Sequence, residues 1–332
     1  MIDIKNCPST LAEGCVTYSP KAVKTLFGGQ RASHVLDFSL DGSSNAESIA
    51  AAMQRISVSG VQEKLPAVVE KGKIRLAADG ERSMFLLKPS PWDETLQNRK
   101  QIPANEHLTM QIASQVYGIA TAANGLCFTT KGQPVYITRR FDILPDGTKI
   151  PMEDFAAVIG RNELVDGKEF KYRGCYEDIA AAIRKNVQAW MVDMERFFDL
   201  MVFNYIYANG DDHLKNFSLI MQGQDYRLAP AYDLLNTSLH MKGDDFGLEG
   251  GLSSSLEKSD AYISSGHPCR LDFERFAERI GIVKSRADKI LDRYMTMPKE
   301  AEILVGRSFL NDKMKRYYLR IVRERIAWFI RK

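Results

Sequence analysis

The sequence predicts a mixed α+β protein with a strand-rich N-terminal lobe and a larger helical C-terminal lobe. Short alternating and β-branched runs dominate the first 140 residues, and apolar residues at helical spacing dominate after Phe141. A chain of 332 residues is long enough for two domains or one two-lobed domain. Its composition, 45% hydrophobic and 26% charged, is that of a globular protein and excludes a disordered, collagen-like or disulfide-stapled chain.

The expected elements follow from these patterns. A helix is predicted over Asn105–Val116, because Leu108, Ile112 and Val116 share helical spacing behind Pro103. We expect an N-terminal segment (1–45), an N-lobe (46–140) and a C-lobe (141–332). Strands are predicted at Arg55–Ser59, Leu65–Glu70, Ile74–Ala78, Met84–Lys88, Val135–Arg139, Phe217–Met221 and Tyr226–Ala229, and further helices at 176–190, 193–208, 272–281, 285–296 and 311–332.

Charge, cysteines and hydropathy indicate a cytoplasmic protein. The 45 Lys and Arg residues against 42 Asp and Glu give a formal charge of +3, which provides no argument for direct nucleic-acid binding. Five scattered cysteines without a CxxC pair are typical of reduced thiols. No signal peptide is recognisable at the N-terminus, and no apolar run reaches the ~18 residues that a membrane span needs.

The most informative segment is Tyr207–Phe217, which reads YANGDDHLKNF and separates an apolar helix from a strand. It is either a solvated loop with an Asx turn or a catalytic loop for phosphoryl transfer. In that chemistry an Asp accepts the proton of the substrate hydroxyl, and an Asn a few residues later holds Mg²⁺. Asp211 and Asn216 have the required types and order.

A second carboxylate, Asp233, follows Asn216 by 17 residues in the run LAPAYDL. A hairpin would return it beside the catalytic loop, where it could supply the second oxygen ligand for Mg²⁺. Alone, Asp233 could equally be a helix N-cap. The pairing with Asn216 favours the metal-ligand interpretation.

The N-lobe offers candidate phosphate-binding groups. Lys88 ends an apolar strand, which is the position of the phosphate-binding lysine in kinases but also that of a solvated strand edge. Glu106 opens the predicted helix and could be its partner, or could simply favour the helix dipole. The run SVSGVQEK from Ser57 to Lys64 could cradle phosphates or form an ordinary hairpin, and no Walker A motif is present.

Taken together, these motifs resemble the HipA-type serine/threonine kinases, the toxin components of bacterial toxin–antitoxin systems. The resemblance rests on SxSGxQEK, FLLKPSP, the NEH helix start, RRFD, GDDHLKNFSL and LAPAYDLL, in collinear order from about Ser57 to Leu235. It implies a two-lobed protein-kinase-like fold, ATP and Mg²⁺ as cofactors, and phosphorylation of a protein.

The resemblance also implies residue roles. Asp211 would be the catalytic base, and Asn216 and Asp233 would be the metal ligands. Lys88 would bind phosphate, and the stretch Arg139–Phe141 would meet adenine through its backbone. The full set of implied ATP-binding residues is Ser59, Gly60, Val61, Gln62, Glu63, Lys64, Lys88, Arg139, Arg140, Phe141, His213, Leu214, Lys215, Asn216, Tyr232 and Asp233.

One departure from the family pattern concerns the N-terminus. Full-length members carry an additional subdomain ahead of the nucleotide loop, and only 56 residues precede Ser57 here. This resembles the short HipT form, in which a separate small protein, HipS, supplies the missing piece. Ser57 and Ser59 resemble the doubly phosphorylatable motif of short members, so autophosphorylation is expected at both.

The resemblance implies partners as well. They are a HipS-like protein, a HipB-like helix-turn-helix antitoxin through which any DNA contact would be indirect, and an aminoacyl-tRNA synthetase as substrate, with the tryptophanyl enzyme favoured. Two alternatives remain open: a kinase-fold binding module, and a kinase acting on a small molecule or lipid. The basic C-terminal helix, with Met314, Tyr318, Val322, Ile326 and Phe329/Ile330 on one stripe, is either packed with a solvated basic face or a nucleic-acid contact.

Overall fold

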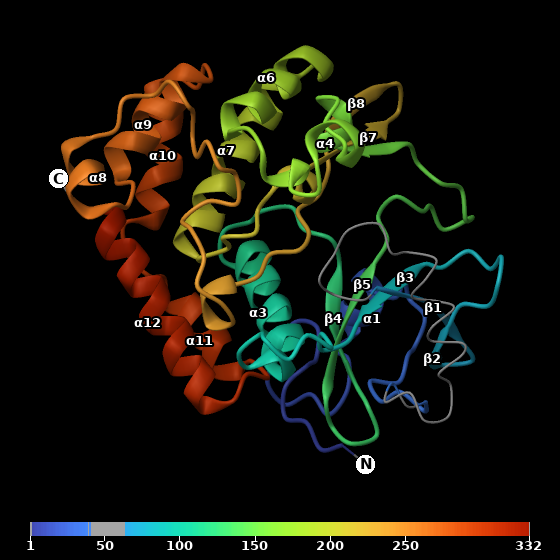
Figure 1. Ribbon diagram of the computed structural model, residues 1–332. Coiled ribbons are helices and arrows are strands. Elements are labelled where there is room, and N and C mark those ends of the chain that lie inside the picture. Colours follow the sequence, from blue (N-terminus) through green and yellow to red (C-terminus); the bar gives the residue numbers. More distant parts are fainter. Residues whose placement is uncertain (1, 39, 41–63, 332) are drawn as a thin grey trace. The chain divides into compact units, whose positions relative to one another are not determined.

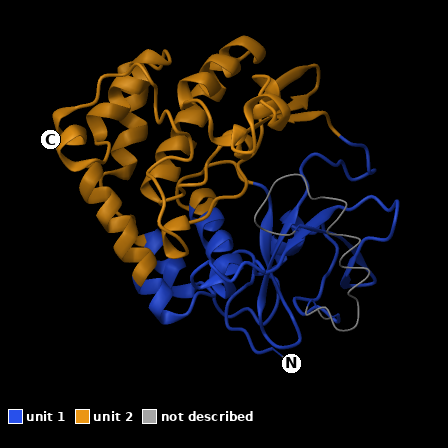
Figure 2. Cartoon of the chain, viewed as in Figure 1, with its two compact units in different colours: residues 1–112, 122–149, 300–316 blue, residues 113–121, 150–299, 317–332 orange. Residues whose placement is uncertain are grey.

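The computed structural model describes residues 2–38, 40 and 64–331 of the chain. They form two compact units (Figures 1 and 2). Unit 1 comprises Met1–Ile112, Ala122–Lys149 and Glu300–Arg316, and unit 2 comprises Ala113–Thr121, Ile150–Lys299 and Tyr317–Lys332. Each unit is assembled from three stretches of chain, so its limits differ from a division at single positions such as 45/46 and 140/141.

Unit 1 contains a five-stranded antiparallel sheet in the order β2-β1-β3-β5-β4. Lys71 and Gly72 join β1 to β2 with positive φ angles of 49° and 79°, which is the backbone of a tight hairpin. Four of the five predicted N-lobe strands are confirmed, and Arg55–Ser59 lies outside the described residues. The strands are β1 (Leu65–Glu70), β2 (Lys73–Leu76), β3 (Phe85–Lys88), β4 (Asn124–Phe128) and β5 (Pro134–Arg139).

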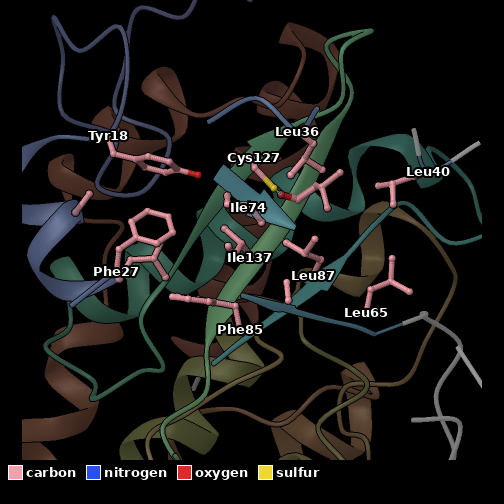
Figure 3. Close-up of a cluster of buried hydrophobic side chains, with 14 of the residues drawn as sticks. Tyr18, Phe27, Leu36, Leu40, Leu65, Ile74, Phe85, Leu87, Cys127 and Ile137 are labelled. Atoms are coloured by element: carbon pink, nitrogen blue, oxygen red, sulfur yellow. Dashed lines mark hydrogen bonds between the residues drawn. The ribbon is translucent and has the colours of Figure 1, made fainter. Parts of the chain in front are cut away.

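One face of this sheet is covered by the N-terminal segment, residues 2–38 and 40. Its helix α1 (Pro20–Thr25) begins behind Ser19, whose side chain accepts from the main-chain N–H of Ala22. Segment and strands contribute side chains to one buried apolar cluster (Figure 3). The cluster includes Tyr18, Leu26, Phe27, Leu36, Leu40, Leu65, Ile74, Phe85, Leu87, Cys127 and Ile137.

The same segment pairs with the edge strand β4, which the sequence did not predict. The N–H of Leu126 donates to Pro8 at 2.6 Å, and the N–H of Phe128 donates to His34 at 2.8 Å. The N–H of Leu36 in turn donates to the carbonyl of Phe128 at 2.8 Å. These bonds satisfy main-chain groups that an edge strand would otherwise expose.

Helix α3 (Ile102–Gln115) confirms the helix predicted for the N-lobe and starts three residues earlier. Pro103 lies in its first turn, where a missing N–H costs nothing. The helix is buried from Ile102 through Ala113. Unit 1 also includes α11 (Lys299–Arg307), whose last residue accepts a hydrogen bond from the side chain of Asn6 at 2.8 Å.

Unit 2 is mainly helical, as predicted, with a three-stranded antiparallel sheet in the order β6-β7-β8. The predicted strands correspond to β7 and β8, and the predicted helices to α6, α7, α9, α10 and α12, with ends shifted by up to five residues. The elements are β6 (Met152–Asp154), α4 (Phe155–Val158), α5 (Glu163–Asp166), α6 (Tyr176–Asn186), α7 (Trp190–Ile206), β7 (Ser218–Gln222), β8 (Asp225–Leu228), α8 (Asp260–Ser265), α9 (Arg270–Arg279), α10 (Lys284–Leu291) and α12 (Asp312–Phe329), whose residues up to Arg316 belong to unit 1. Short 3₁₀ turns lie at Phe170–Tyr172, Leu214–Asn216, Thr237–Leu239 and Asp292–Tyr294, and a further one lies in unit 1 at Arg99–Gln101.

The C-terminal helix α12 buries the predicted apolar stripe. Met314, Tyr318, Val322 and Phe329 are fully buried, and Ile326 is nearly so. Ile330 is 44% exposed because the helix ends at Phe329, so its assignment to the stripe was wrong. Among the residues described here, no helix combines the length and apolar character that crossing a bilayer requires.

Candidate active site

A buried ion pair joins β3 to α3 in unit 1. Lys88 Nζ donates to Glu106 Oε1 at 2.6 Å, and the two side chains are only 4% and 3% exposed. The ammonium also lies 5.3 Å from the centre of the Tyr136 ring on β5. Lys88 is therefore not a solvated strand edge, and Glu106 is its partner, as the sequence interpretation allowed.

The free-energy cost of burying the Lys88–Glu106 ion pair indicates that the pair serves a function rather than stability. Burying two charges costs several kcal/mol, about as much as their attraction returns, so such pairs are a weak source of stability. A lysine held by a helix glutamate is the arrangement that binds nucleotide phosphates in protein kinases. The pair provides unit 1 with a fixed cation and a fixed partner for it.

The stretch expected to meet adenine, Arg139–Phe141, begins at the last residue of β5. The N–H groups of Arg139 and Arg140 donate to the carbonyls of Ala123 and Met84 at 2.8 and 2.9 Å, so both are used within the sheet. The guanidinium of Arg140 pairs with Asp142 at 2.6 Å. An adenine contact here would use carbonyls or the main chain at Phe141.

Most of the predicted nucleotide loop cannot be placed. Ser57, Ser59, Gly60, Val61, Gln62 and Glu63 lie outside the described residues. Lys64 is half-buried and directly precedes β1. Their implied roles stay predictions.

In unit 2, the catalytic loop begins where α7 ends. The chain turns sharply at Ala208, which adopts a left-handed φ of 54°, and Asp211 follows with its side chain 49% exposed. Asn216 Nδ2 donates to the main-chain carbonyl of Asp211 at 2.7 Å. This bond fixes the loop and leaves the amide oxygen of Asn216 as the atom that could ligate a metal.

The carboxylate of Asp211 accepts a hydrogen bond from Tyr172. The hydroxyl lies 2.8 Å from Oδ1 and comes from the 3₁₀ turn Phe170–Tyr172. The sequence interpretation did not include Tyr172, because it lies 39 residues before Asp211 in an irregular stretch with no periodic pattern. In one sequence, no signal connects the two residues.

His213 lies beside this pair as a neutral imidazole. Its Nε2 is 4.0 Å from Asp211 Oδ1, and its ring meets the Tyr172 ring edge to face at 5.1 Å. Burial lowers the pKa of His213 to about 4, against the attraction of Asp211 and Asp233. Leu214 is fully buried, and Lys215 Nζ lies 3.9 Å from Asp154 Oδ2, so the residues that follow His213 are held in place.

Asp212 is a structural anchor for this loop. It is buried, accepts from Tyr176 Oη at 2.5 Å, and accepts from the N–H of Gly247 at 2.8 Å. Burial raises its pKa to about 7, although these hydrogen bonds lower it. The sequence interpretation assigned no role to Asp212.

Two glycines bring the segment 237–248 against the loop. A Cβ on Gly210 would lie 2.6 Å from the carbonyl oxygen of Asp244, and one on Gly247 would lie 2.6 Å from the nitrogen of Asp212. The hydroxyl of Thr237 accepts from the N–H of Gly210 at 2.9 Å. Only glycine allows the backbones to approach this closely.

Asp233 follows β8 and comes close to the same loop. Its φ is +57°, and its carbonyl accepts from Asn209 Nδ2 at 3.5 Å. Tyr232, its neighbour, donates to the carbonyl of Lys215 at 2.9 Å and lies 2.5 Å from the hydroxyl of Ser218. No α-helix begins at Asp233, which excludes the N-cap alternative.

These residues fit Mg²⁺ better than a metal held entirely by protein. The described residues contain no group of three His, Cys, Asp or Glu side chains able to enclose an ion. Mg²⁺ is usually bound by one or two protein oxygens together with substrate phosphates and water. The Asn216 amide oxygen and the Asp233 carboxylate are donors of the required kind.

A cavity of about 670 Å³ opens beside Asp211 within unit 2. Its wall includes Tyr172, Gly210 and the loop around Gly247.

Comparison with known families identifies the chain. Residues 56–301 match the model of the HipA-like C-terminal domain family. The chain belongs to this family. The match includes Lys88, Glu106, Asp211, Asn216 and Asp233, so the candidate residues of both units lie within the matched range.

Curated relatives carry kinase names. The chain is 28% identical over 191 residues to the Sinorhizobium fredii protein "Putative kinase Y4mE", covering 55% of the chain and 43% of that protein. It is 32% identical over 228 residues to "Putative kinase Y4dM" of the same organism, covering 63% and 51%. It spans about half the length of these two relatives. A Haemophilus influenzae "Putative kinase" is 25% identical over 290 residues, with 82% of both chains covered.

Solved structures show the same fold. HipA of Shewanella oneidensis, solved with HipB and operator DNA, aligns with a TM-score of 0.61 at 17% identity, over 82% of this chain and 64% of that one. The Helicobacter pylori proinflammatory kinase CtkA aligns with a TM-score of 0.50 at 16% identity, over 79% and 93%. The predicted α+β, kinase-like fold of the HipA type is thus confirmed.

Proposed function

We propose that this HipA-family chain is a serine/threonine protein kinase that uses ATP and Mg²⁺. The observation that carries the proposal is the buried pair of Lys88 and Glu106 at 2.6 Å, because an active kinase requires this pair between strand and helix. Asp211 and Asn216 in unit 2 supply the base and the metal ligand of the same chemistry.

Each of these residues would have a separate role in the reaction. Lys88 holds phosphate oxygens of ATP, and Glu106 keeps its ammonium in place. Asp211 accepts the proton of the attacking hydroxyl, and neutral His213 adds no competing positive charge beside it. Asn216 and Asp233 hold Mg²⁺, which when bound offsets negative charge on the phosphates.

The first experiment is label transfer from γ-labelled ATP to proteins of a dialysed bacterial extract. We expect transfer that depends on Mg²⁺ and is lowered by about three orders of magnitude with Asp211→Ala, with label on phosphoserine or phosphothreonine. A kinase-fold binding module would bind partners without transferring label. A kinase for small molecules or lipids would label only the non-protein fraction.

The proposal extends to a toxin of a type II toxin–antitoxin system in the cytoplasm. The Shewanella relative was solved with HipB and DNA, which supports a HipB-like antitoxin as partner. The short HipT-like form with a HipS-like partner, and the tryptophanyl-tRNA synthetase as substrate, rest on the motif resemblance. Phosphoproteomics of cells expressing the chain tests the substrate, because a synthetase without a new phosphosite would contradict it.

Autophosphorylation at Ser57 and Ser59 is part of the same proposal. A phosphate adds about −1.5 to −2 charges at neutral pH, which would repel the triphosphate of ATP from the loop. Intact-mass spectra after incubation with Mg²⁺ and ATP should show phosphate on the wild type and none on Asp211→Ala. Unmodified wild-type protein would contradict this regulation.

A further inference from the structure

Two side chains hold Asp211, one at its main-chain carbonyl and the other at its carboxylate. Asn216 fixes its main-chain carbonyl at 2.7 Å, and Tyr172 Oη lies 2.8 Å from its Oδ1. In the described part of the chain, no other hydrogen bond reaches the carboxylate. The side chain of a half-exposed Asp would otherwise sample several rotamers, so the Tyr172 bond selects one of them.

Tyr172 is itself firmly fixed. Its carbonyl accepts from the N–H of Glu249 at 2.9 Å, which ties the 3₁₀ turn Phe170–Tyr172 to the wall of the cavity. Its ring packs edge to face on His213 at 5.1 Å, and Lys171 Nζ lies 4.8 Å from its centre. The turn, the loop and the imidazole together leave the hydroxyl little freedom.

The direction of the hydrogen bond is settled by protonation. Burial raises the pKa of Tyr172 well above its ordinary value, and the negative charge of Asp211 raises it further. The phenol therefore keeps its proton at any physiological pH, and its O–H donates a hydrogen bond to the carboxylate. It cannot accept a proton from an attacking hydroxyl in place of Asp211.

A carboxylate has two oxygens, and a general base needs only one of them for the substrate. We propose that Tyr172 is a positioning residue for phosphoryl transfer: its hydroxyl holds Oδ1 of Asp211 and leaves Oδ2 for the hydroxyl of the acceptor. This rests on the proposed kinase function. Displacing a reacting group by about 1 Å can cost about 100-fold in rate, so one such bond has a measurable effect.

The test compares Tyr172→Phe with Tyr226→Phe in the full chain. Tyr226 is also half-buried in unit 2, and its hydroxyl makes no hydrogen bond among the described residues. Label transfer from γ-labelled ATP to extract proteins is measured, with the extract alone as blank. Tyr172→Phe should lower kcat about 10-fold or more with KM for ATP within about twofold, and Tyr226→Phe should match the wild type.

A double-mutant cycle separates positioning from general stability. In the Asp211→Ala background, Tyr172→Phe should cause no further loss of residual transfer, because the group it positions is gone. Tyr172→Phe should also melt within a few degrees of the wild type. A further loss in that background would show that Tyr172 acts through folding and would overturn the inference.

The remaining outcomes are also decisive. If Tyr172→Phe is as active as the wild type, the inference is wrong and the kinase assignment stands. If it is more active, the hydroxyl occupies the acceptor's place and acts as an inhibitor, which also contradicts positioning. If wild-type protein transfers no label at all, the proposed function fails, and this inference fails with it.

Discussion

The two candidate half-sites differ in how their key side chains are held. In unit 1, Lys88 and Glu106 are almost fully buried between a strand and a helix, and their positions follow from the packing of both elements. In unit 2, Asp211 is half-exposed and is held by single hydrogen bonds from Tyr172 and Asn216. The first site depends on the core and the second on a network of polar contacts, so mutations in them should fail in different ways.

The largest expected effect is loss of transfer without loss of fold. Asp211→Ala and Asp233→Ala should each lower phosphoryl transfer by about three orders of magnitude, because they remove the proposed base and a proposed metal ligand. Asp211 is half-exposed, so Asp211→Ala should melt near the wild type, whereas Asp233→Ala should melt somewhat lower because alanine is strained at a φ of +57°. Activity and melting are measured on the same preparation, and a folded Asp211→Ala with wild-type activity would contradict the assignment.

For the buried pair Lys88 and Glu106, we expect a loss of stability as well as a loss of activity. Lys88→Ala leaves the Glu106 carboxylate buried without its cation, which should cost about 3–5 kcal/mol in the free energy of unfolding as well as activity. The double variant Lys88→Met/Glu106→Leu should recover much of that stability but none of the activity. Denaturant unfolding measures both, and a stable Lys88→Ala would show that unit 1 tolerates the unpaired charge.

An intermediate effect is expected where the segment 237–248 meets the catalytic loop. Gly247→Ala places a Cβ 2.6 Å from the Asp212 nitrogen, so one backbone must move. We expect a loss of about 1–3 kcal/mol in the free energy of unfolding together with reduced transfer. Gly243→Ala is the matched control, since neither Gly243 nor Gly247 has a positive φ and a Cβ on Gly243 would meet no atom within 4 Å. Equal activities of the two variants would show that the close contact is dispensable.

The smallest effect is in the pH dependence of stability. The folded pKa of Asp212, about 7, is raised, so its contribution is present at low pH and is lost as pH rises toward 7. The folded pKa values of His107 and His213, about 4, are depressed, so stability from these two histidines increases between about pH 4 and 6.5. The two trends oppose each other.

Asp212→Asn should therefore make stability rise more steeply over this pH range than in the wild type. Melting temperatures at half-unit steps from pH 4 to 7.5 provide the measurement, with Asp225→Asn, on an exposed residue, as the control. Parallel curves for wild type and Asp212→Asn would show that Asp212 is ionised throughout.

Local sequence patterns predicted the elements that neighbouring residues in the sequence determine. Strands β1, β3 and β5 show apolar runs of the right length, and the catalytic loop is recognisable because a helix, a polar run and a strand follow one another. Strand β4 was missed because Asn124–Phe128 is buried along its whole length and shows no alternation. The N-terminal segment was predicted, but its structure was not, because it depends on partners distant in the chain, such as Gly72 for Ser33 and Phe128 for Leu36.

The residues of the candidate site divide in the same way, into those that lie within a compact motif and those that come from distant stretches of the chain. Lys88, Asp211, Asn216 and Asp233 were found because each lies within a compact motif. Tyr172, and Gly247 with its contact to Asp212, were not found, because they meet the loop from stretches without periodicity. What fixes a functional group in space is often distant in sequence, and a single sequence carries no record of such pairs.

The N-terminal segment has a consequence for the order of events during synthesis. Asn6 donates to the carbonyl of Arg307, and Glu13 pairs with the guanidinium of the same residue at 2.9 Å. Asn6 is thus synthesised 301 positions before the residue whose carbonyl it contacts. A nascent chain can pair β1 with β2 early, but unit 1 reaches its final form only after Arg307 has been synthesised.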